Sequence, residues 1–187
     1  MKKEATDDEH LRRAKAGDMA AFEHLVKKYE PQVAATVIGM LGPCQAAEDV
    51  GQEVFIRFYK YMQSFREDSA LGTYLTRIAI NSSLNELRKR KRWRFFFRSS
   101  DNNEVSEPAS HPDEARYANE TQRLVHQAIQ KLAPEFRAVI VLRLIEGYST
   151  EETAKILNIP LGTVLSRLSR AQQKLKVYLM PYVQEEI

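Results

Sequence analysis

The amino-acid sequence predicts an all-α protein with two small helical domains joined by a flexible acidic linker. The 187-residue chain contains only seven glycines and seven prolines, and strand-like alternation is hard to find. Apolar residues recur mostly at spacings of three and four, which is typical of amphipathic helices. Residues 99–119 are polar, contain two prolines and have almost no large apolar side chain. We therefore expect domains at 1–98 and 121–187, with a linker at 99–120.

The composition excludes several classes of protein. Charged residues make up 28% and hydrophobic residues 43% of the chain, as in a globular protein that folds in water. No apolar run approaches the roughly 20 residues of a bilayer-spanning helix, and no secretory signal is visible. We therefore expect a cytoplasmic protein without direct membrane insertion. Cys44 is the only cysteine and the four histidines are scattered, so we expect no metal site and no cofactor.

The net charge of +3 is unevenly distributed. Residues 61–98 contain nine Lys or Arg and three Asp or Glu, whereas residues 99–120 contain one and six. Residues 121–187 again have a basic excess, with nine against six. Two basic blocks therefore flank an acidic one, and such asymmetry is more informative than the net value.

The first helix with candidate binding residues contains Asp49–Phe55 and continues to Phe65. Its expected core face consists of Val50, Val54, Phe58, Tyr61, Met62 and Phe65. A second face collects Asp49, Gln52, Glu53 and Ile56. Such a mixed acidic and apolar stripe can dock a helical partner by electrostatic complementarity, although an ordinary surface face has the same pattern.

A second helix, expected at 74–92, places an aromatic ring, arginines and amides on one exposed stripe. The stripe consists of Tyr74, Arg77, Asn81, Asn85 and Arg88, at steps of three and four. Aromatic and guanidinium planes stack on exposed bases, so the stripe suits single-stranded DNA better than a plain solvated face. Residues 88–94 then contain six basic residues in seven, which repel one another unless a polyanion compensates them. For Trp93 and Phe95–Phe97 we favour packing in the core or against a partner over contact with nucleic acid.

A helix-turn-helix pattern is the sharpest signal in the chain. Ser149 and Glu152 have the spacing of a capping box at a helix start, and Asn158 tolerates the left-handed geometry of a turn. A second helix begins at about Thr163, with a buried stripe expected at Val164, Leu168, Ala171 and Leu175. The outward positions can contact bases and phosphates in a major groove, although a plain helical hairpin has the same pattern. These positions are Thr163, Leu165, Ser166, Arg167, Ser169, Arg170, Gln173 and Lys174.

No catalytic grouping is found. The sequence has no glycine-rich phosphate loop, no serine elbow motif and no histidine spaced beside a cysteine or carboxylate. We therefore do not expect an enzyme.

Taken in order, these features resemble the extracytoplasmic-function sigma factors, group 4 of the sigma-70 family, over nearly the whole chain except the linker. Ala46–Phe55 is similar to the helix of sigma region 2 that binds core RNA polymerase. The resemblance implies contact with the coiled-coil clamp helices of the largest polymerase subunit. The residues to which it assigns this contact are Asp49, Gln52, Glu53, Phe55 and Ile56.

Phe65–Ala70, followed by Thr73–Asn81, resembles the loop and helix with which region 2 recognises the minus-ten element. The resemblance implies that the loop holds a flipped-out base, and trapping a base outside the stack stabilises melted DNA without ATP. Tyr74 stands where the family usually has Trp, and we expect it to keep the stacking or packing role with a smaller ring. The residues expected at this element are Phe65, Ser69, Ala70, Tyr74, Arg77, Asn81, Asn85, Arg88 and Arg90.

Gly147–Arg167, together with Ala171, resembles sigma region 4, which reads the duplex minus-thirty-five element. Leu165 stands where the family commonly has Lys or Arg, so an apolar contact to a thymine methyl group can take the place of one polar contact. By resemblance, the acidic linker runs through the polymerase channel that later takes RNA.

The resemblance thus implies an alternative sigma factor that directs polymerase to promoters. The implied partners are core RNA polymerase, through its clamp helices and flap, and promoter DNA in duplex and single-stranded form. An anti-sigma factor that occludes the two domains is implied as well. Two other interpretations stay open: a helix-turn-helix regulator that binds operators without polymerase, and a helical adaptor that binds no DNA.

Overall fold

The computed structural model of the chain describes residues 6–65, 70–98 and 120–183. Over these ranges every regular element is helical, so the predicted all-α class is confirmed. The first domain contains α1 (Asp7–Lys15), α2 (Met19–Leu41), α3 (Gln45–Tyr61), the 3₁₀ turn η1 (Met62–Ser64) and α4 (Leu71–Arg98). The second contains α5 (Glu120–Gln130), α6 (Pro134–Ile140), the π-helical turn η3 (Val141–Ile145), α7 (Thr150–Leu157) and α8 (Leu161–Val183). Residues 99–119 of the expected linker lie outside the described residues, and Glu120 is the first residue of α5.

Side-chain caps fix where several helices begin. The carboxylate of Asp18 accepts hydrogen bonds from the backbone amides of Ala20 and Ala21 at the start of α2. Ser149 and Glu152 form the predicted capping box at the start of α7. These bonds satisfy backbone N–H groups that have no partner within the helix. Among the described residues, no helix is long and apolar enough to cross a membrane.

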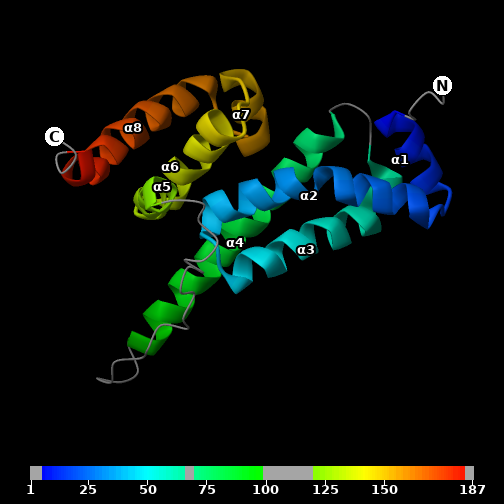
Figure 1. The fold of residues 1–187 in the computed structure, drawn as a ribbon, viewed down its shortest axis with the longest axis horizontal. Helices are drawn as coiled ribbons and strands as arrows, with labels where there is room; N and C mark the ends of the chain where they lie inside the picture. Colours follow the sequence, from blue (N-terminus) through cyan, green and yellow to red (C-terminus); the bar gives the residue numbers. More distant parts are fainter. Residues whose placement is uncertain (1–5, 66–69, 99–119, 184–187) are drawn as a thin grey trace.

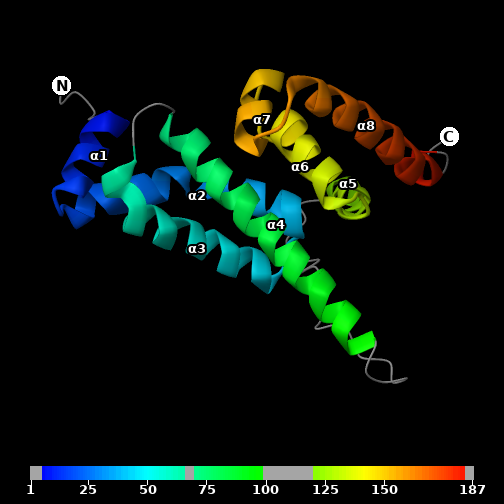
Figure 2. The same cartoon turned by 180° about the vertical axis from the view of Figure 1, so that it is seen from behind.

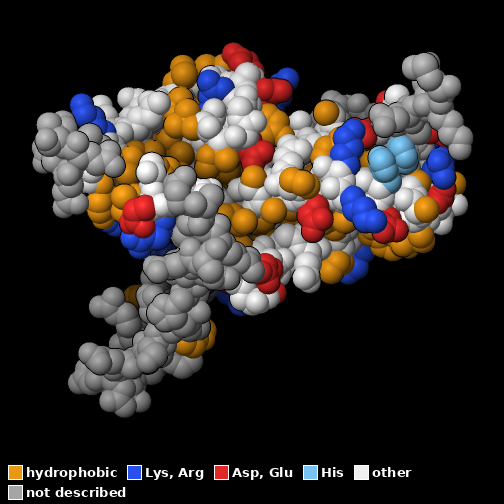
Figure 3. Space-filling view, in the orientation of Figure 1, with side chains coloured by type: hydrophobic (Ala, Val, Ile, Leu, Met, Phe, Trp, Pro, Cys, Tyr) orange, Lys and Arg blue, Asp and Glu red, His pale blue; other side chains and the backbone are white. Residues whose placement is uncertain are grey.

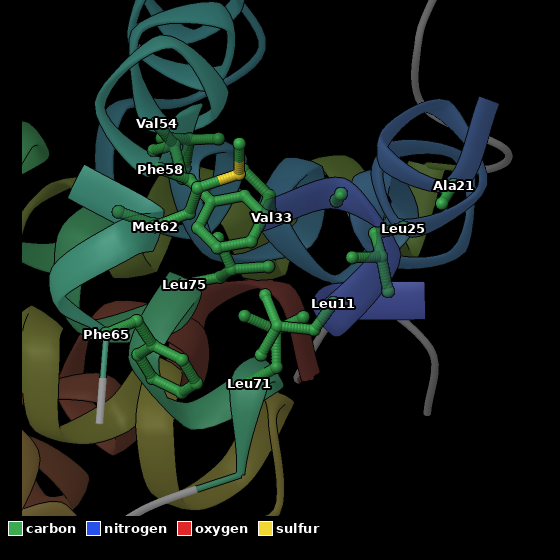
Figure 4. Packing of buried hydrophobic residues seen from close by; sticks show 13 residues of the cluster. Leu11, Ala21, Leu25, Val33, Val54, Phe58, Met62, Phe65, Leu71 and Leu75 are labelled. Carbon is green, nitrogen blue, oxygen red and sulfur yellow. The ribbon is translucent and has the colours of Figure 1, made fainter. Parts of the chain in front are cut away.

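The first domain has its own core, to which side chains from α1, α2, α3 and α4 all contribute (Figure 4). Phe58 of α3 and Leu75 of α4 are almost fully buried there, packed with Val33 of α2. A separate core in the second domain joins α5, α6 and α8 through Ile129, Ile140 and Ala171. Each domain therefore has apolar packing that does not depend on the other.

A third cluster joins the two domains, which the sequence had not predicted. Met40 and Ile80 from the first domain pack with Val141, Leu142 and Ile156 from the second, and all five are buried. α5, α6 and η3 lie against α2, and α6 and α7 lie against α4. Both ribbon views show the second domain seated on α2 and α4, with α8 on its outer side (Figure 1, Figure 2). Besides their separate cores, the two domains therefore share this third cluster.

The C-terminal part of α4 projects from this body. α4 contains 28 residues, so it is about 42 Å long at 1.5 Å per residue. Its middle packs against the other helices through Leu84 and Leu87, and both views show its C-terminal end extending past the other helices (Figure 1, Figure 2). The basic block of the sequence lies on this projecting segment.

Candidate nucleic-acid and partner interfaces

The predicted partner-binding face of α3 is exposed. Val54 and Phe58 on the opposite side of the helix are buried in the first core, which fixes the rotation of α3. Asp49 and Gln52 consequently face outward, and the Ile56 side chain is 49% exposed. An apolar side chain held in water beside a carboxylate is a feature of docking sites.

Two members of the expected α3 set have other contacts. Glu53 is half-buried and its carboxylate pairs with Arg57 one turn further on, at 2.7 Å. Phe55 is half-buried and packs against the first core. They therefore flank the exposed part of the face.

The structure also corrects the expected core face of this helix. Tyr61, predicted to be buried, is 60% exposed, and Tyr59 is exposed as well. Tyr59 follows Ile56 by three positions and adds exposed apolar surface beside it. Tyr61 lies on a different side of the helix. Sequence periodicity missed them because α3 ends at Tyr61 and the chain then tightens into η1, which changes the direction of the side chains.

The stripe on α4 divides into an exposed part and a packed part. Asn81, Asn85 and Arg88 are exposed, and the Arg88 guanidinium donates a hydrogen bond to the Asn85 side-chain oxygen at 3.0 Å. Thr76 and Ile80, on another face of the helix, are fully buried. That burial orients the amide and arginine side chains of the stripe toward solvent.

The N-terminal end of the stripe is packed rather than exposed. Tyr74 is half-buried, with its ring 4.7 Å from the Phe65 ring, and Phe65 itself is buried. Burial raises the pKa of the Tyr74 hydroxyl above its ordinary value. Arg77 is half-buried and Ala70 exposed, whereas Ser69 lies outside the described residues. Phe65 and Tyr74 thus form an aromatic support at the end of the loop.

Arg90 is turned toward the protein. Its guanidinium donates to the Glu86 carboxylate at 3.0 Å and contacts the Cys44 sulfur at 3.7 Å. Arg88 is exposed, whereas Arg90 is half-buried, although both were predicted to contact DNA. The sulfur of Cys44 is buried, as expected for a small core residue.

Two residues continue the exposed stripe beyond the predicted set. Arg92 follows Arg88 by four positions and Phe95 follows by three more, so both lie on the same helix face. Arg92 is exposed, and Phe95 is 79% exposed, so Phe95 is not part of a core and packing against a partner stays a prediction. Among the described residues, the side chains that line an open groove here are Asn85, Arg88, Lys91, Arg92 and Phe95. The same spacing rule applied past Arg88 would have found them.

Trp93 is only partly covered, with 40% of its side chain exposed. The side chains of Phe96 and Phe97 lie outside the described residues. Neither Trp93 nor Phe95 is buried in a core, and the expected packing of these rings against a partner stays a prediction.

The second domain contains the predicted helix-turn-helix as α7 and α8. Asn158 ends α7 in the left-handed conformation, with φ of 52°, as its place in the turn predicted. Donation from the Ser149 backbone amide to Glu152 in the capping box lowers the pKa of that carboxyl. α8 begins at Leu161, two residues earlier than expected, because Pro160 accepts the first backbone bonds from Thr163 and Val164.

The helix α8 presents the predicted residues outward. Val164 and Ala171 are fully buried and fix the inner face. Thr163 and Arg167 are half-buried, and Leu165 is 50% exposed. The remaining predicted positions are exposed: Ser166, Ser169, Arg170, Gln173 and Lys174. Hydroxyl, amide and cationic groups are thus gathered on one face of a helix, together with one leucine.

Comparisons with known proteins agree with this division into two parts. The Sigma-70 region 2 family model matches residues 25–93, and the Sigma-70, region 4 model matches residues 122–175. Together they identify the class: a sigma-70 factor whose first domain is region 2 and whose second is region 4.

Relatives narrow the class. The RNA polymerase sigma-H factor of Pseudomonas aeruginosa is 35% identical, over 96% of each chain. The ECF RNA polymerase sigma-E factor of Escherichia coli K12 is 34% identical, over 98% of this chain and 99% of its own. Among solved structures, the sigma factor RpoE of Bartonella quintana, in complex with the anti-sigma factor NepR, is 28% identical. It superposes with a TM-score of 0.68, covering 85% of this chain and 96% of its own. The chain belongs to the extracytoplasmic-function sigma factors, which bind core RNA polymerase and direct it to promoters.

Proposed function

We propose that three exposed faces divide the work of promoter opening among them: α3 binds the polymerase clamp, α4 holds the melted minus-ten strand, and α8 reads the minus-thirty-five duplex. One observation carries this assignment. Asn81 of α4, Ile56 of α3 and Arg170 of α8 are all exposed, while the opposite side of each helix is buried in a core. Rigid helices hold these side chains in place, which favours accurate recognition over adaptable contact.

The α3 face suits a helical partner with basic and apolar side chains. Asp49 supplies charge, and Ile56 and Tyr59 supply exposed apolar area on the same helix. Aromatic residues of this kind contribute most of the binding energy at protein interfaces. We assign this face to the clamp helices of the largest polymerase subunit.

The α4 stripe suits a single strand because it alternates amides with cations. Asn81 and Asn85 can read the pairing edges of unstacked bases, whereas Arg88 and Arg92 neutralise phosphates. Phe65 and Tyr74, packed ring against ring at 4.7 Å, stabilise the end of the loop expected to hold the flipped base. Strand capture then comes from binding energy alone, so the protein acts as a non-catalytic subunit.

The α8 face suits the major groove of a duplex. Arg167 and Arg170 can pair with guanine or phosphate, and Gln173 can pair with adenine. Leu165 offers an apolar contact to a thymine methyl group, which favours an A·T pair at its position.

We infer the regulation and the cellular location of this protein from its relatives. The Bartonella quintana relative was solved in complex with an anti-sigma factor, and we assign a regulator of that class to this chain too. We assign this chain to the cytoplasm, because polymerase and promoters are found there.

A helix-turn-helix regulator acting without polymerase is the weaker alternative. It would use α8, but it leaves the exposed α3 face and the α4 stripe without a role. The match to region 2 over residues 25–93 favours the sigma assignment.

Three substitutions, each on one face, separate the three steps. Ile56→Asp should abolish binding to core polymerase, measured by the shift of a labelled protein in size-exclusion chromatography. Asn81→Ala should leave core binding intact and weaken capture of a single-stranded minus-ten oligonucleotide by the holoenzyme. Arg170→Ala should weaken only the binding of a duplex minus-thirty-five fragment and leave the other two activities intact. Ala35→Leu, on an exposed position of α2, is the control. Equal loss of all three activities in every variant would contradict the division of labour.

A further inference from the structure

The C-terminal end of α1 contacts Phe65, the first residue of the segment Phe65–Ala70 that resembles the minus-ten loop. The Lys15 ammonium donates a hydrogen bond to the Phe65 carbonyl at 3.0 Å and lies 5.8 Å from the centroid of the Phe65 ring. A cation over an aromatic face is attracted to it, and a hydrogen bond from a charged donor is stronger than one from a neutral donor. One side chain therefore holds both the backbone and the ring of Phe65.

A second hydrogen bond links the same two elements in the opposite direction. The Gln63 side-chain amide, from η1, donates to the Lys15 carbonyl at 2.6 Å. The two bonds join residues that are 48 and 50 positions apart in the sequence. Gln63 thus fixes the backbone of Lys15, and Lys15 in turn fixes Phe65.

The helix α1 is itself firmly attached to the first domain. Leu11 and Ala14 are buried in the first core, and Figure 4 shows Leu11 among side chains from the other helices. At the other end of α1, the Asp7 carboxylate accepts hydrogen bonds from Lys28 Nζ at 2.5 Å and from the Tyr29 hydroxyl at 2.7 Å. α1 is therefore held at both ends and along its inner face.

Tyr29 also supports the other flank of Phe65–Ala70. Gly72, in the first turn of α4, lies so close to α2 that a Cβ atom there would meet Tyr29 Cε1 and Gln32 Oε1, each at 3.0 Å. The hydroxyl of this tyrosine is bonded to α1. α1 therefore contacts one flank of the segment through Lys15 and supports the other through Tyr29.

The positive charges of α1 are engaged by the protein. Arg12 pairs with Glu9 at 2.8 Å, and Arg13 pairs with Asp18 at 2.6 Å. Figure 3 shows basic and acidic side chains intermixed at the end of the molecule that α1 forms. A surface that binds phosphates gathers cations on one face instead. This pattern favours a supporting role for α1 over direct contact with DNA.

The Phe65 ring connects this support to the stripe on α4. It lies 4.7 Å from the Tyr74 ring, and Tyr74 precedes Asn81 by seven residues, which is about two turns on the same helix face. A base held between the aromatic pair and Asn81 is read accurately only if both keep their positions, because recognition groups tolerate displacements of only about 0.5 Å.

We infer that Lys15 is a positioning residue for minus-ten recognition: it fixes Phe65 relative to Asn81 and so sets how sharply the holoenzyme discriminates between bases. The inference rests on the proposed assignment of α4 to the minus-ten strand. It gives α1, which none of the three proposed binding faces includes, a role in promoter recognition.

Binding of single-stranded oligonucleotides by the holoenzyme tests this role. One oligonucleotide contains the minus-ten element mapped by run-off transcription, and the others contain it with one base replaced at a time. The ratio of their dissociation constants measures discrimination. Lys15→Met keeps the length of the side chain but loses the donor and the charge, so it should reduce this ratio by about tenfold at the most sensitive position. Lys15→Arg keeps both and should restore the ratio to within about twofold of the wild type.

Two further variants surround this comparison. Gln63→Met removes the second bond and should reduce the ratio by about threefold. Arg12→Met breaks an exposed ion pair of the same helix and should leave the ratio unchanged. If Lys15→Met weakens binding of all oligonucleotides equally and leaves the ratio unchanged, its role is merely structural and the inference is overturned. A salt slope lowered by about one with an unchanged ratio would show direct phosphate contact by Lys15 and would overturn it as well.

Asn81→Ala in the same assay separates this inference from the proposed function. If Asn81→Ala weakens binding while Lys15→Met keeps the discrimination of the wild type, only the inference fails. If Asn81→Ala leaves binding unchanged, the assignment of α4 to the minus-ten strand fails, and the inference that rests on it fails too.

Discussion

At the scale of single residues, Arg137 donates four hydrogen bonds at the domain contact. Its guanidinium donates to the carbonyls of Met40, Gln130 and Leu132, joining α2 to the turn after α5. Burial lowers its pKa to about 10, with a smaller effect from Arg90, so it stays charged at neutral pH. Buried carbonyls left without donors are costly.

Arg137→Met should therefore lower the free energy of unfolding by about 2–4 kcal/mol, because methionine fills similar space but donates no hydrogen bond. Urea denaturation measures the change. Arg170→Met, at an exposed position, should stay within about 0.5 kcal/mol of the wild type. An equally small effect at Arg137 would show that its bonds contribute little.

Glu146 makes the stability depend on pH. Burial raises the pKa of its carboxyl, and the hydrogen bond from Thr36 opposes this only in part. The folded protein therefore binds this proton more tightly than the unfolded chain, and the stabilisation is lost as pH rises from 4.5 through the folded-state value. Glu146→Gln keeps an acceptor for Thr36 without the titration.

The difference in melting temperature between Glu146→Gln and the wild type should accordingly grow in favour of the variant as pH rises from 4.5 to 8. Thermal unfolding at a series of pH values measures it. Glu135→Gln, at an exposed position, is the control. A constant difference between Glu146→Gln and the wild type would contradict the assignment.

At the scale of elements, the turn between α7 and α8 depends on the backbone of Asn158. Its φ of 52° is open to glycine and asparagine but is strained for a β-branched residue. Asn158→Val should cost about 1–2 kcal/mol of unfolding free energy, whereas Asn158→Gly should be nearly neutral. Chemical denaturation of the two variants distinguishes them, and equal losses would show that the side chain rather than the backbone matters.

The exposed end of α4 yields a second prediction at this scale. Arg92→Ala should weaken binding of the holoenzyme to a single-stranded minus-ten oligonucleotide and reduce the salt slope by about one, because one phosphate contact is lost. Phe95→Ala should weaken binding by about 1–3 kcal/mol without changing the slope, because it removes stacking. Lys89→Ala is the matched control, because Lys89 is an exposed cation outside the stripe. Fluorescence anisotropy at several salt concentrations measures all three, and equal effects at Lys89 would indicate unspecific attraction.

The sequence was sufficient for features that depend on local pattern. The capping box of Ser149 and the left-handed Asn158 follow from spacing and backbone preference alone. Tyr61 was misassigned to the core because an aromatic residue near a helix end is buried only if another element reaches it. That depends on tertiary structure, which periodicity does not report.

At the scale of the whole molecule, the contact between domains could not be predicted from the sequence. Val141 and Leu142 have the pattern of any buried helix, so the sequence does not say whether they face their own domain or another. The structure places them against Met40 and Ile80 of the first domain. A polar acidic linker indicates two domains but does not show whether they touch.

The central claim is that this chain confers promoter selectivity on polymerase through α4 and α8 together. Run-off transcription with purified core polymerase, on fragments of the host genome and with mapped start sites, tests it most directly. We predict promoter-specific transcripts only when the protein is added, sharing one sequence element near minus ten and another near minus thirty-five, and lost on Asn81→Ala or Arg170→Ala. Absence of both transcripts and core binding would contradict the account.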